Sequence, residues 1–423
     1  MPQQSEEEFV NNEDVHEVIE IPNGSVPEEQ EEDDNEIDNE EMNEEMEEEQ
    51  LEIDMRNNSS AYFDAHKDSI YMVTSHPTLP IVATGGGDDI AYIWTTNTEK
   101  PEILATLDRH TESVVAGAFT ADGKFLATGD MSGTLAGWFH NTEKNTWECL
   151  GATKEAEEVV CIAAHDELPL IAAGFSDGAV WVYEFSDAGT PTVSSVSVFV
   201  NHTMPVTAVG FAASPEFQPR VVSCSEDGTI KLSDVYQNTQ LYSLEATALR
   251  GIHPWVQMAV SGTRKTAAFT SMDGILAIVK LDDGQVMHML DVFEGDSTTD
   301  DEGQSIESVS WSDRGQYLAV GTVEGKVIVY DSKTWKPRTS FQLEDAVTGL
   351  KFVDKSPLLV VSGMDGSLCE FDVVANEKVW ECYGHNEGVL SFAVQNNGNR
   401  IITAGDEHVS LVFNRSPTDM IQQ

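Results

Sequence analysis

The stretch SEDGTIKLSD, residues 225–234, combines an Asp-Gly turn with a short strand that ends in an aspartate. Asp-Gly is favoured in tight turns because glycine accepts a positive φ without steric cost. In the strand that follows, isoleucine and leucine alternate with polar residues, which is typical of a half-buried β-strand. One such unit cannot bury its apolar face alone, so a stable fold needs further copies of it.

The unit recurs along the chain at a nearly constant interval. Related stretches are GGDDIAYIW (86–94), DMSGTLAGW (130–138), FSDGAVWVY (175–183), SMDGILAIV (271–279), TVEGKVIVYD (322–331), GMDGSLCEFD (363–372) and the degraded GDEHVSLVF (405–413). Aligned on the turn, the eight copies are separated by 41 to 51 residues. A period of about 40–50 residues is that of a four-stranded propeller blade.

The repeats resemble those of the WD-repeat β-propeller family over residues 61–413. A terminal tryptophan is kept at Trp94 and Trp138, and the histidine that opens such repeats stands at 66, 110, 202 and 385. The resemblance implies an all-β fold, an eight-bladed WD40-type propeller. It also implies that the first strand, near residues 61–64, completes the last blade beside residues 409–413, which removes exposed sheet edges. The fifth repeat is the most divergent, and its first strand is uncertain.

Histidine, serine or threonine, and aspartate recur within the repeats, as in His66, Thr84 and Asp88. These residue types could form a catalytic triad. A set that recurs with the repeats is better explained by structure, and the resemblance implies a hydrogen-bond chain inside each blade. We find no phosphate-binding loop and no metal-binding spacing of Cys or His. The sequence therefore predicts a protein without catalytic residues, metal or cofactor.

The charge is uneven along the chain, whose formal net charge is −51. Residues 1–60 contain 24 of the 74 acidic residues and a single basic one, Arg56. So little apolar surface and so much like charge predict a disordered acidic tail over residues 1–57. We expect the propeller over 58–415 and a short C-terminal tail over 416–423. A tail that merely raises solubility remains an alternative.

The composition also restricts the partners. The remaining 363 residues hold 50 acids and 22 bases, so nucleic acid and anionic membranes should repel the chain, and basic proteins should be attracted.

The N-terminus MPQQSEEEF predicts no signal peptide, and no apolar stretch approaches the roughly 20 residues of a membrane span. Five widely spaced cysteines indicate reduced thiols in a cytosolic or nuclear protein.

Acidic residues recur just before the innermost strands. We aligned the repeats on the first buried apolar residue expected in each, namely Ile70, Val114, Val160, Val206, Val309, Val347 and Val389. Two residues earlier stand Asp68, Glu112, Glu158, Met204, Glu307, Asp345 and Glu387. Six acids in seven positions exceed the overall acidic frequency of about one in seven in residues 61–423. The pattern predicts a carboxylate ring at the channel mouth that binds a peptide rich in Arg and Lys.

Further acids occupy the turns that should lie on the same face, a little farther out. They are Asp89, Glu226, Glu324 and Asp406. A merely solvated acidic rim remains the alternative explanation of both sets. Clustered like charges cost stability through repulsion, however, so an account from stability alone expects mixed signs.

A narrower resemblance covers the whole chain. LEIDMRNNS (51–59), TGGGDDIAYIW, ATGDMSGTL, SIESVSWS (305–312), LEDAVTGLKF (343–352), GHNEGVLSF (384–392) and ITAGDEHVSLVF (402–413) resemble the fungal dedicated chaperones of the ribosomal QM protein. That protein belongs to the L-ten, or universal L-sixteen, family of the large subunit, and the angio-associated migratory cell protein is the animal relative. The resemblance implies a propeller that captures the basic N-terminal segment of its newly made client and delivers it to the pre-60S particle.

By this resemblance the client-binding residues are Glu112, Glu158, Glu307 and Asp406, and the internal alignment adds Asp68, Asp345 and Glu387. Met204 departs from the acidic pattern. We expect a monomer that contacts the pre-60S particle transiently, without direct binding to nucleic acid or membrane. The resemblance implies a cytoplasmic location, and entry into the nucleus is left open. A generic WD-repeat adaptor and a histone-type chaperone remain alternatives.

Deletion of residues 1–57 tests the role of the acidic tail. We hypothesise that the tail either raises the negative potential near the client site or competes with the client for it. The first version predicts slower client association after deletion, and the second predicts tighter binding. Stopped-flow kinetics and calorimetry with a basic client peptide measure both quantities. Unchanged kinetics and affinity would exclude both versions.

Overall fold

The computed structural model describes residues 55–415, except 155, 214–217, 294–303 and 313–314. The described residues belong to one compact unit, which lies within Ile53–Gln423. The predicted acidic tail lies outside the described residues except for its last three, 55–57, and the predicted C-terminal tail lies outside them entirely. The domain boundaries inferred from sequence therefore stay predictions.

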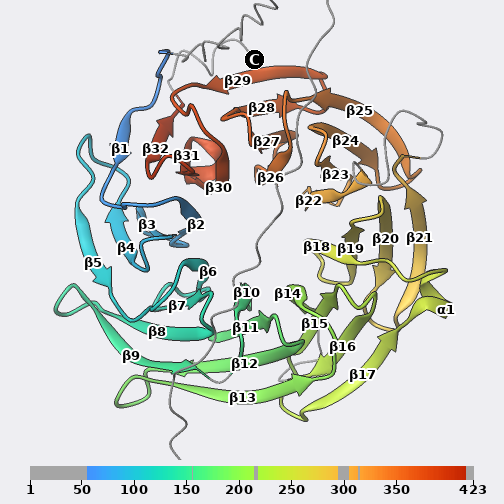
Figure 1. The fold of residues 1–423 in the computed structure, drawn as a ribbon, viewed down its shortest axis with the longest axis horizontal. Coiled ribbons are helices and arrows are strands. Elements are labelled where there is room, and N and C mark those ends of the chain that lie inside the picture. Colours follow the sequence, from blue (N-terminus) through green and yellow to red (C-terminus); the bar gives the residue numbers. More distant parts are fainter. Residues whose placement is uncertain (1–54, 155, 214–217, 294–303, 313–314, 416–423) are drawn as a thin grey trace, which may run out of the picture. The chain divides into compact units, whose positions relative to one another are not determined.

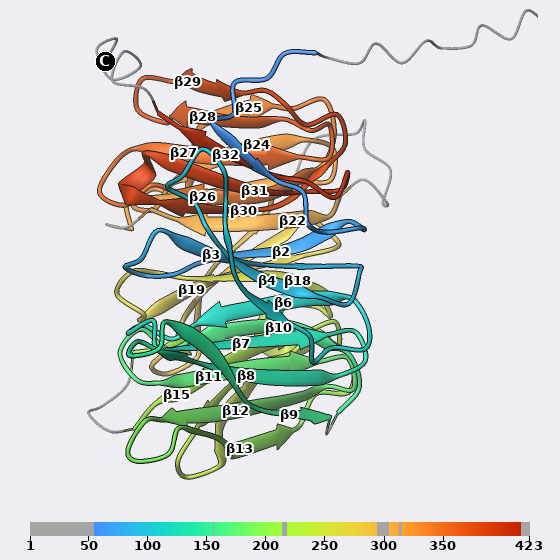
Figure 2. The ribbon, with the colours of Figure 1, turned by 90° about the vertical axis from the view of Figure 1, so that its left-hand side faces the viewer.

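The described strands form eight four-stranded sheets arranged as a ring, which confirms the predicted eight-bladed propeller (Figure 1). Within each sheet the neighbouring strands are antiparallel, and consecutive blades follow the order of the chain. Figure 2 shows the strands edge-on, running between loops on one side of the ring and loops on the other.

Blade 1 contains β2 (Ile70–Ser75), β3 (Ile81–Gly86), β4 (Ala91–Thr95) and β5 (Ile103–Leu107), and blade 2 contains β6 (Val114–Phe119), β7 (Phe125–Asp130), β8 (Thr134–Asn141) and β9 (Thr146–Lys154). Blade 3 contains β10 (Val159–Ala164), β11 (Leu170–Phe175), β12 (Ala179–Ser186) and β13 (Thr192–Val200), and blade 4 contains β14 (Val206–Ala212), β15 (Arg220–Ser225), β16 (Ile230–Asp234) and β17 (Thr239–Leu244).

The short helix α1 (Ala246–Leu249) precedes blade 5, which contains β18 (Trp255–Val260), β19 (Thr266–Ser271), β20 (Ile275–Lys280) and β21 (Gln285–Asp291). Blade 6 contains β22 (Ile306–Trp311), β23 (Tyr317–Thr322), β24 (Lys326–Asp331) and β25 (Lys336–Gln342), and blade 7 contains β26 (Val347–Phe352), β27 (Leu358–Gly363), β28 (Leu368–Asp372) and β29 (Glu377–Cys382). Blade 8 contains β30 (Val389–Gln395), the 3₁₀ turn η2 (Asn396–Gly398), β31 (Arg400–Gly405), β32 (Ser410–Asn414) and, from the other end of the propeller, β1 (Ala61–Phe63).

The ring closes by pairing β1 with β32, as the sequence predicted. Ala61 lies opposite Val412, and Phe63 lies opposite Ser410. Phe63 stacks on Trp94 of blade 1, with ring centroids 4.6 Å apart. This strand therefore completes the sheet of blade 8 and also packs against blade 1, so it joins the last blade to the first.

Hydrophobic residues are buried between successive blades. The second strands β3, β7, β11 and β27 are buried along their whole length, because each is flanked within its sheet and covered on both faces. One core cluster joins Met72 and Ile93 of blade 1 to Val114, Leu126 and Trp138 of blade 2. Contacts of this kind around the ring place every blade in a fixed position relative to its neighbours.

The histidine, threonine and aspartate of the first two repeats form the expected hydrogen-bond chain. In blade 1, His66 Nδ1 lies 3.0 Å from Asp88 and Nε2 lies 3.0 Å from Thr84 Oγ1. The Trp94 indole N–H also donates to Thr84, at 3.1 Å. Equivalent contacts connect His110 with Thr128 and Asp130 in blade 2. These side chains have structural partners, which agrees with their predicted non-catalytic role.

The fifth repeat could not be aligned because its histidine is displaced. His253 stands two residues before Trp255, the start of its innermost strand, whereas His66 stands four residues before Ile70. His253 Nδ1 still lies 2.7 Å from Asp273, and its Nε2 lies 3.2 Å from the carbonyl of Leu249. The blade thus keeps its histidine–aspartate contact at an altered spacing.

All five cysteines are free thiols, as predicted from their spacing. Cys224 is fully buried, and Cys161 is half-buried. Burial raises the pKa of both thiols to about 12. Both are therefore protonated at neutral pH.

Acid should destabilise the propeller through its buried histidines. Burial lowers the pKa of His66 and His202 more than their aspartate partners raise it. The unfolded chain therefore binds more protons below the ordinary histidine pKa of about 6.5, so stability falls as the pH drops through that value. In the variant His66→Gln/His202→Gln, the unfolding free energy should depend less on pH between pH 7 and 5, by up to about 1.4 kcal/mol per pH unit for each histidine. Urea denaturation at several pH values measures this slope, and an unchanged slope contradicts the assignment.

Candidate functional site

One backbone hydrogen bond recurs in all eight blades and joins two loops on one side of the ring. The turn between the second and third strands donates an N–H to the carbonyl of the residue that precedes the innermost strand. The pairs are Gly87–Ser69, Met131–Ser113, Ser176–Glu158, Glu226–Pro205, Met272–Pro254, Val323–Ser305, Met364–Ala346 and Asp406–Gly388, at 2.9–3.2 Å. We call the surface formed by these loops the entry face, because the innermost strands begin there.

Four predicted acids occupy equivalent positions on the entry face. Asp68, Glu112, Asp345 and Glu387 each stand two residues before an innermost strand, and all four side chains are exposed. The structure therefore places them in blades 1, 2, 7 and 8 as the sequence alignment predicted. Because the ring follows chain order, these four blades are consecutive.

In blade 3 the predicted residue lies one position closer to the strand than expected. The innermost strand begins at Val159, not at Val160. Glu158 therefore directly precedes the strand, and the exposed Glu157 holds the position two residues before it. The alignment was wrong because two adjacent valines look equivalent in sequence. Only the β-bulge between Val159 and Cys161 shows which of them begins the pairing.

In blade 6 the alignment was wrong by three residues. The innermost strand begins at Ile306, not at Val309, so Glu307 is the second residue of the strand and lies at the bulge between Ile306 and Ser308. Its side chain is half-buried and accepts a hydrogen bond from the Ser305 hydroxyl. Glu307 thus belongs to the entry face, but it lies deeper than the exposed acids of the other blades.

The predicted turn acids also lie on the entry face, at three different positions of the turn. Glu226 and Asp406 donate the recurring backbone hydrogen bond. Glu324 is the next residue of its turn, and Asp89 is the one after that, with a φ of 62°. Glu324 is exposed, and the other three are half-buried.

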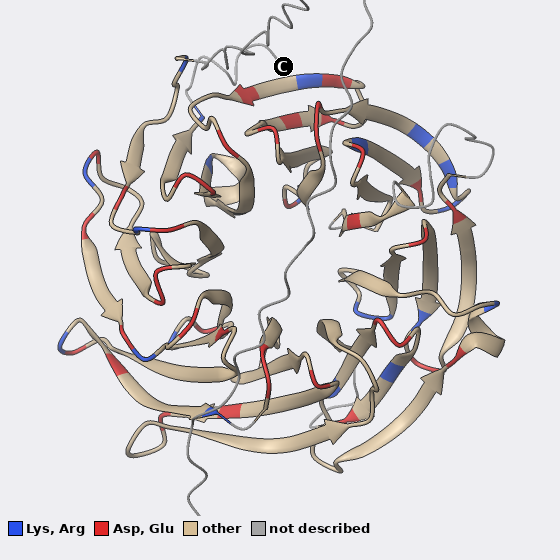
Figure 3. Cartoon of the chain, viewed as in Figure 1, with Lys and Arg blue, Asp and Glu red and all other residues tan. Residues whose placement is uncertain are grey.

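The ten acids predicted from the sequence have no cationic partner among the described residues. Within the described part of the chain, Asp68 and Asp345 accept hydrogen bonds only from the backbone N–H of the following residue, at 2.8 and 2.7 Å. Asp and Glu colour many of the loops near the innermost strands in Figure 3, whereas Lys336, Arg338 and Lys378 lie on the outermost strands β25 and β29.

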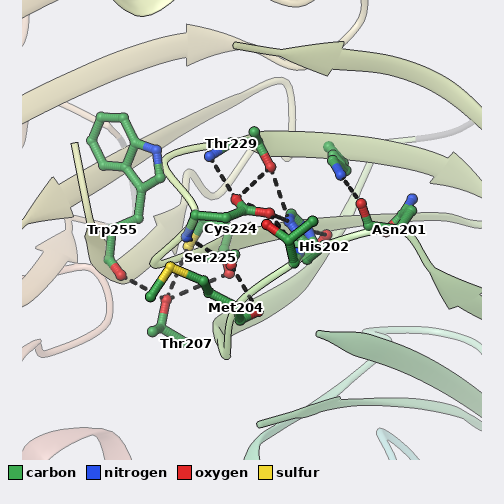
Figure 4. Close-up of polar contacts among 12 residues, drawn as sticks. Asn201, His202, Met204, Thr207, Cys224, Ser225, Thr229 and Trp255 are labelled. Atoms are coloured by element: carbon green, nitrogen blue, oxygen red, sulfur yellow. Dashed lines mark hydrogen bonds and ion pairs between the residues drawn. The ribbon is translucent and has the colours of Figure 1, made fainter. Parts of the chain in front are cut away.

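Other acids in the same loops are used differently. Asp227 is half-buried and accepts bonds from His202, from Thr229 and from the backbone N–H of Thr203 (Figure 4). Burial alone would raise the pKa of Asp227, but these bonds together hold it well below its ordinary value. The acids of these loops thus fall into two classes: acids such as Asp227 fix the loops, and the predicted acids form no ion pair among the described residues.

Other kinds of site find little support in the described part of the chain. No group of three or more His, Cys, Asp and Glu side chains there could hold a metal ion. No helix among those residues is both long and apolar enough to cross a membrane.

Comparisons with known proteins agree with this architecture. The model of the WD domain, G-beta repeat, matches residues 57–95, 101–138, 193–234 and 376–411, and the model of the anaphase-promoting complex subunit 4 WD40 domain matches residues 258–355. The ribosome assembly protein SQT1 of Saccharomyces cerevisiae is 34% identical over 382 residues, which cover 86% of this chain and 88% of that protein. The chain belongs to the Sqt1 family.

Solved structures of the Sqt1 family superpose on this propeller. The crystal structure of Saccharomyces cerevisiae Sqt1 gives a TM-score of 0.80 at 33% identity and covers 86% of this chain and all of its own. The Chaetomium thermophilum Sqt1 bound to the N-terminus of the ribosomal protein L10 gives 0.75 at 30% identity, covering 85% of this chain and 100% of its own. The human angio-associated migratory cell protein is 25% identical over 84% of this chain and 80% of its own length.

If the entry-face acids are not needed for folding, neutralising them should not destabilise the propeller. We expect Asp345→Asn/Glu387→Gln to raise the unfolding free energy by up to about 0.5 kcal/mol at low salt, since it removes repulsion between exposed like charges. The gain should shrink as added salt screens the remaining charges. Thermal unfolding at two salt concentrations measures it. A clear loss of stability would show that these carboxylates have a structural role.

Proposed function

We propose that this protein is a dedicated ribosome-assembly chaperone. Its entry face binds the basic N-terminal segment of a newly made large-subunit ribosomal protein of the L10, or QM, family, and the protein delivers this client to the pre-60S particle. The observation that carries the proposal is the set of entry-face carboxylates without cationic partners among the described residues. The Sqt1 relative bound to the N-terminus of the ribosomal protein L10 supports the same choice of client.

The proposed client contacts come from seven of the eight blades. They are Asp68, Glu112, Glu158, Glu307, Asp345, Glu387 and Asp406, with Asp89, Glu226 and Glu324 as a secondary rim. Carboxylates accept charge-assisted and often bidentate hydrogen bonds from guanidinium groups, which favours an arginine-rich ligand. Glu157 joins this set because the structure gives it the position that the sequence alignment assigned to Glu158.

The same chemistry explains why such a client needs a chaperone. A basic segment that later contacts rRNA is unneutralised before assembly, and it would bind other nucleic acids non-specifically. A carboxylate face offers it a temporary substitute for phosphate groups. The negative field also accelerates association with a positive ligand, and added salt weakens that effect.

The proposed role involves binding and release only, without a catalytic step, metal or cofactor. We propose that a monomer meets its client in the cytoplasm, where ribosomal proteins are synthesised. Contact with the pre-60S particle is transient and requires no direct binding to nucleic acid.

Charge reversal on the entry face tests the proposal. The variant Glu112→Lys/Glu387→Lys should weaken binding of a synthetic peptide with the N-terminal sequence of the client by about tenfold or more, because two attractive contacts become repulsive. Isothermal titration calorimetry at low and physiological salt measures the change.

The matched control is Glu143→Lys/Glu377→Lys, which alters the net charge equally. Both residues are exposed and lie on the side of the ring away from the entry face, Glu143 in the turn that leads to β9 and Glu377 at the first position of β29. If the two double variants lose affinity equally, the peptide senses only net charge and the proposed site is wrong. Recovery of histones rather than a ribosomal protein with the full-length chain from lysate would instead support the histone-chaperone alternative.

A further inference from the structure

Four exposed methionines share the entry face with the acids. Met131, Met204, Met272 and Met364 have exposed fractions of 46, 46, 51 and 38%. Among the described residues, Met55 and Met287 are the only other methionines exposed to this extent. Isolated exposed apolar residues are ordinary, but a concentration of them on one face marks an interaction surface.

Three of these methionines are equivalent around the ring. Met131, Met272 and Met364 each donate the recurring backbone hydrogen bond of their blades, at 3.0, 2.9 and 2.9 Å. Met204 holds the position two residues before the innermost strand of blade 4, which in blade 2 is occupied by Glu112. The Ser225 hydroxyl donates to the Met204 carbonyl at 3.0 Å and fixes the loop there (Figure 4).

Methionines and carboxylates are close neighbours where the blades meet. The Met364 side chain packs against Gly388, the residue that follows Glu387. A Cβ added at Gly388 would lie only 3.0 Å from both Sδ and Cε of Met364. The backbone N–H of Met364 bonds to Ala346, the residue after Asp345. Met364 thus contacts the residues that directly follow two acids, Asp345 of its own blade and Glu387 of the next.

The position two residues before the innermost strand divides the entry face into two arcs. The acidic arc comprises Asp68, Glu112, Glu157, Asp345 and Glu387, from blades 7, 8, 1, 2 and 3. In blades 4, 5 and 6 the same position is held by Met204, His253 and Gln304. The apolar arc consists of Met204, Met272 and Ile252, which is 71% exposed and lies against the turn at Gly228.

We propose that the client segment is amphipathic and binds across both arcs. Its basic side chains contact the acidic arc, and its aliphatic or aromatic side chains contact Met204, Ile252 and Met272. Methionine suits this role because its unbranched, polarisable side chain adapts to aliphatic and aromatic partners. Carboxylates alone would accept many basic segments, and the apolar arc restricts the choice and sets the direction of the chain. The inference rests on the proposed function and adds the chemistry of the client.

Substitution of the methionines by glutamate separates this inference from recognition by charge alone. The variant Met204→Glu/Met272→Glu extends the carboxylate ring into blades 4 and 5. If charge alone selects the client, the variant binds the basic N-terminal peptide more tightly. If the apolar arc contacts the client, affinity falls by about tenfold, which corresponds to the loss of two partly buried apolar side chains.

Three controls accompany the measurement by calorimetry. Met204→Leu/Met272→Leu keeps an apolar side chain of similar volume and should bind within about twofold of the unmodified protein. Met287→Glu adds a charge at an exposed methionine on the outermost strand β21 and should leave affinity unchanged. A peptide with its apolar residues replaced by serine, at equal charge, should bind the unmodified protein weakly and lose nothing further with the glutamate variant.

The outcomes distinguish the two proposals. If the unmodified protein does not bind the client peptide, the proposed function fails and this inference fails with it. If it binds, but the glutamate variant binds equally or more tightly, the amphipathic client is wrong and the proposed function stands. Should thermal unfolding show that the glutamate variant is not folded, Met204→Ser/Met272→Ser replaces it, with an expected loss of about fivefold and with retained affinity as the contradicting result.

Discussion

The pairing of β1 with β32 is the interaction on which the rest of the propeller depends. Each of the other seven sheets is built from one continuous segment, whereas this sheet joins the two ends of the propeller. Without β1, the strand β32 would present an open edge, and the stacking of Phe63 on Trp94 would be lost. A closed ring also fixes where every innermost strand begins, and so it fixes the circle on which the entry-face side chains stand.

The entry face is a compromise between folding and binding. The recurring backbone hydrogen bond and the histidine–aspartate contacts fix the loops by means that do not need the exposed carboxylates. Those carboxylates and the neighbouring methionines therefore add little to the stability of the blades. Like charges around one rim repel one another, which lowers the stability of the isolated propeller. Exposed methionines promote association, which lowers its solubility. A ligand that supplies cationic and apolar groups together would relieve both.

The sequence predicted the fold almost completely because the repeat is periodic. Eight copies of the turn-and-strand unit gave the number of blades, and the histidines showed where four of the eight repeats open. The prediction was incomplete where local spacing changed. In blade 5 the start of β18 stayed uncertain in the sequence, since His253 stands only two residues before the strand, whereas His66 stands four residues before β2. The acidic positions of blades 1, 2, 7 and 8 were predicted correctly, because in each of them the first β-branched residue after the acid begins the innermost strand.

By itself, the sequence determined the all-β repeat architecture, the closing strand, the excess of acidic residues and their recurrence near the turns, because these follow from periodicity and residue type alone. Only the tertiary structure decided which residues share a position on the entry face. It moved Glu158 and Glu307 relative to their counterparts and brought Glu157 into the ring. It also placed Met131, Met204, Met272 and Met364 beside the carboxylates. The physical reason is that β-bulges and the contacts between neighbouring blades set the start of each strand, and residues many positions apart in sequence supply those contacts.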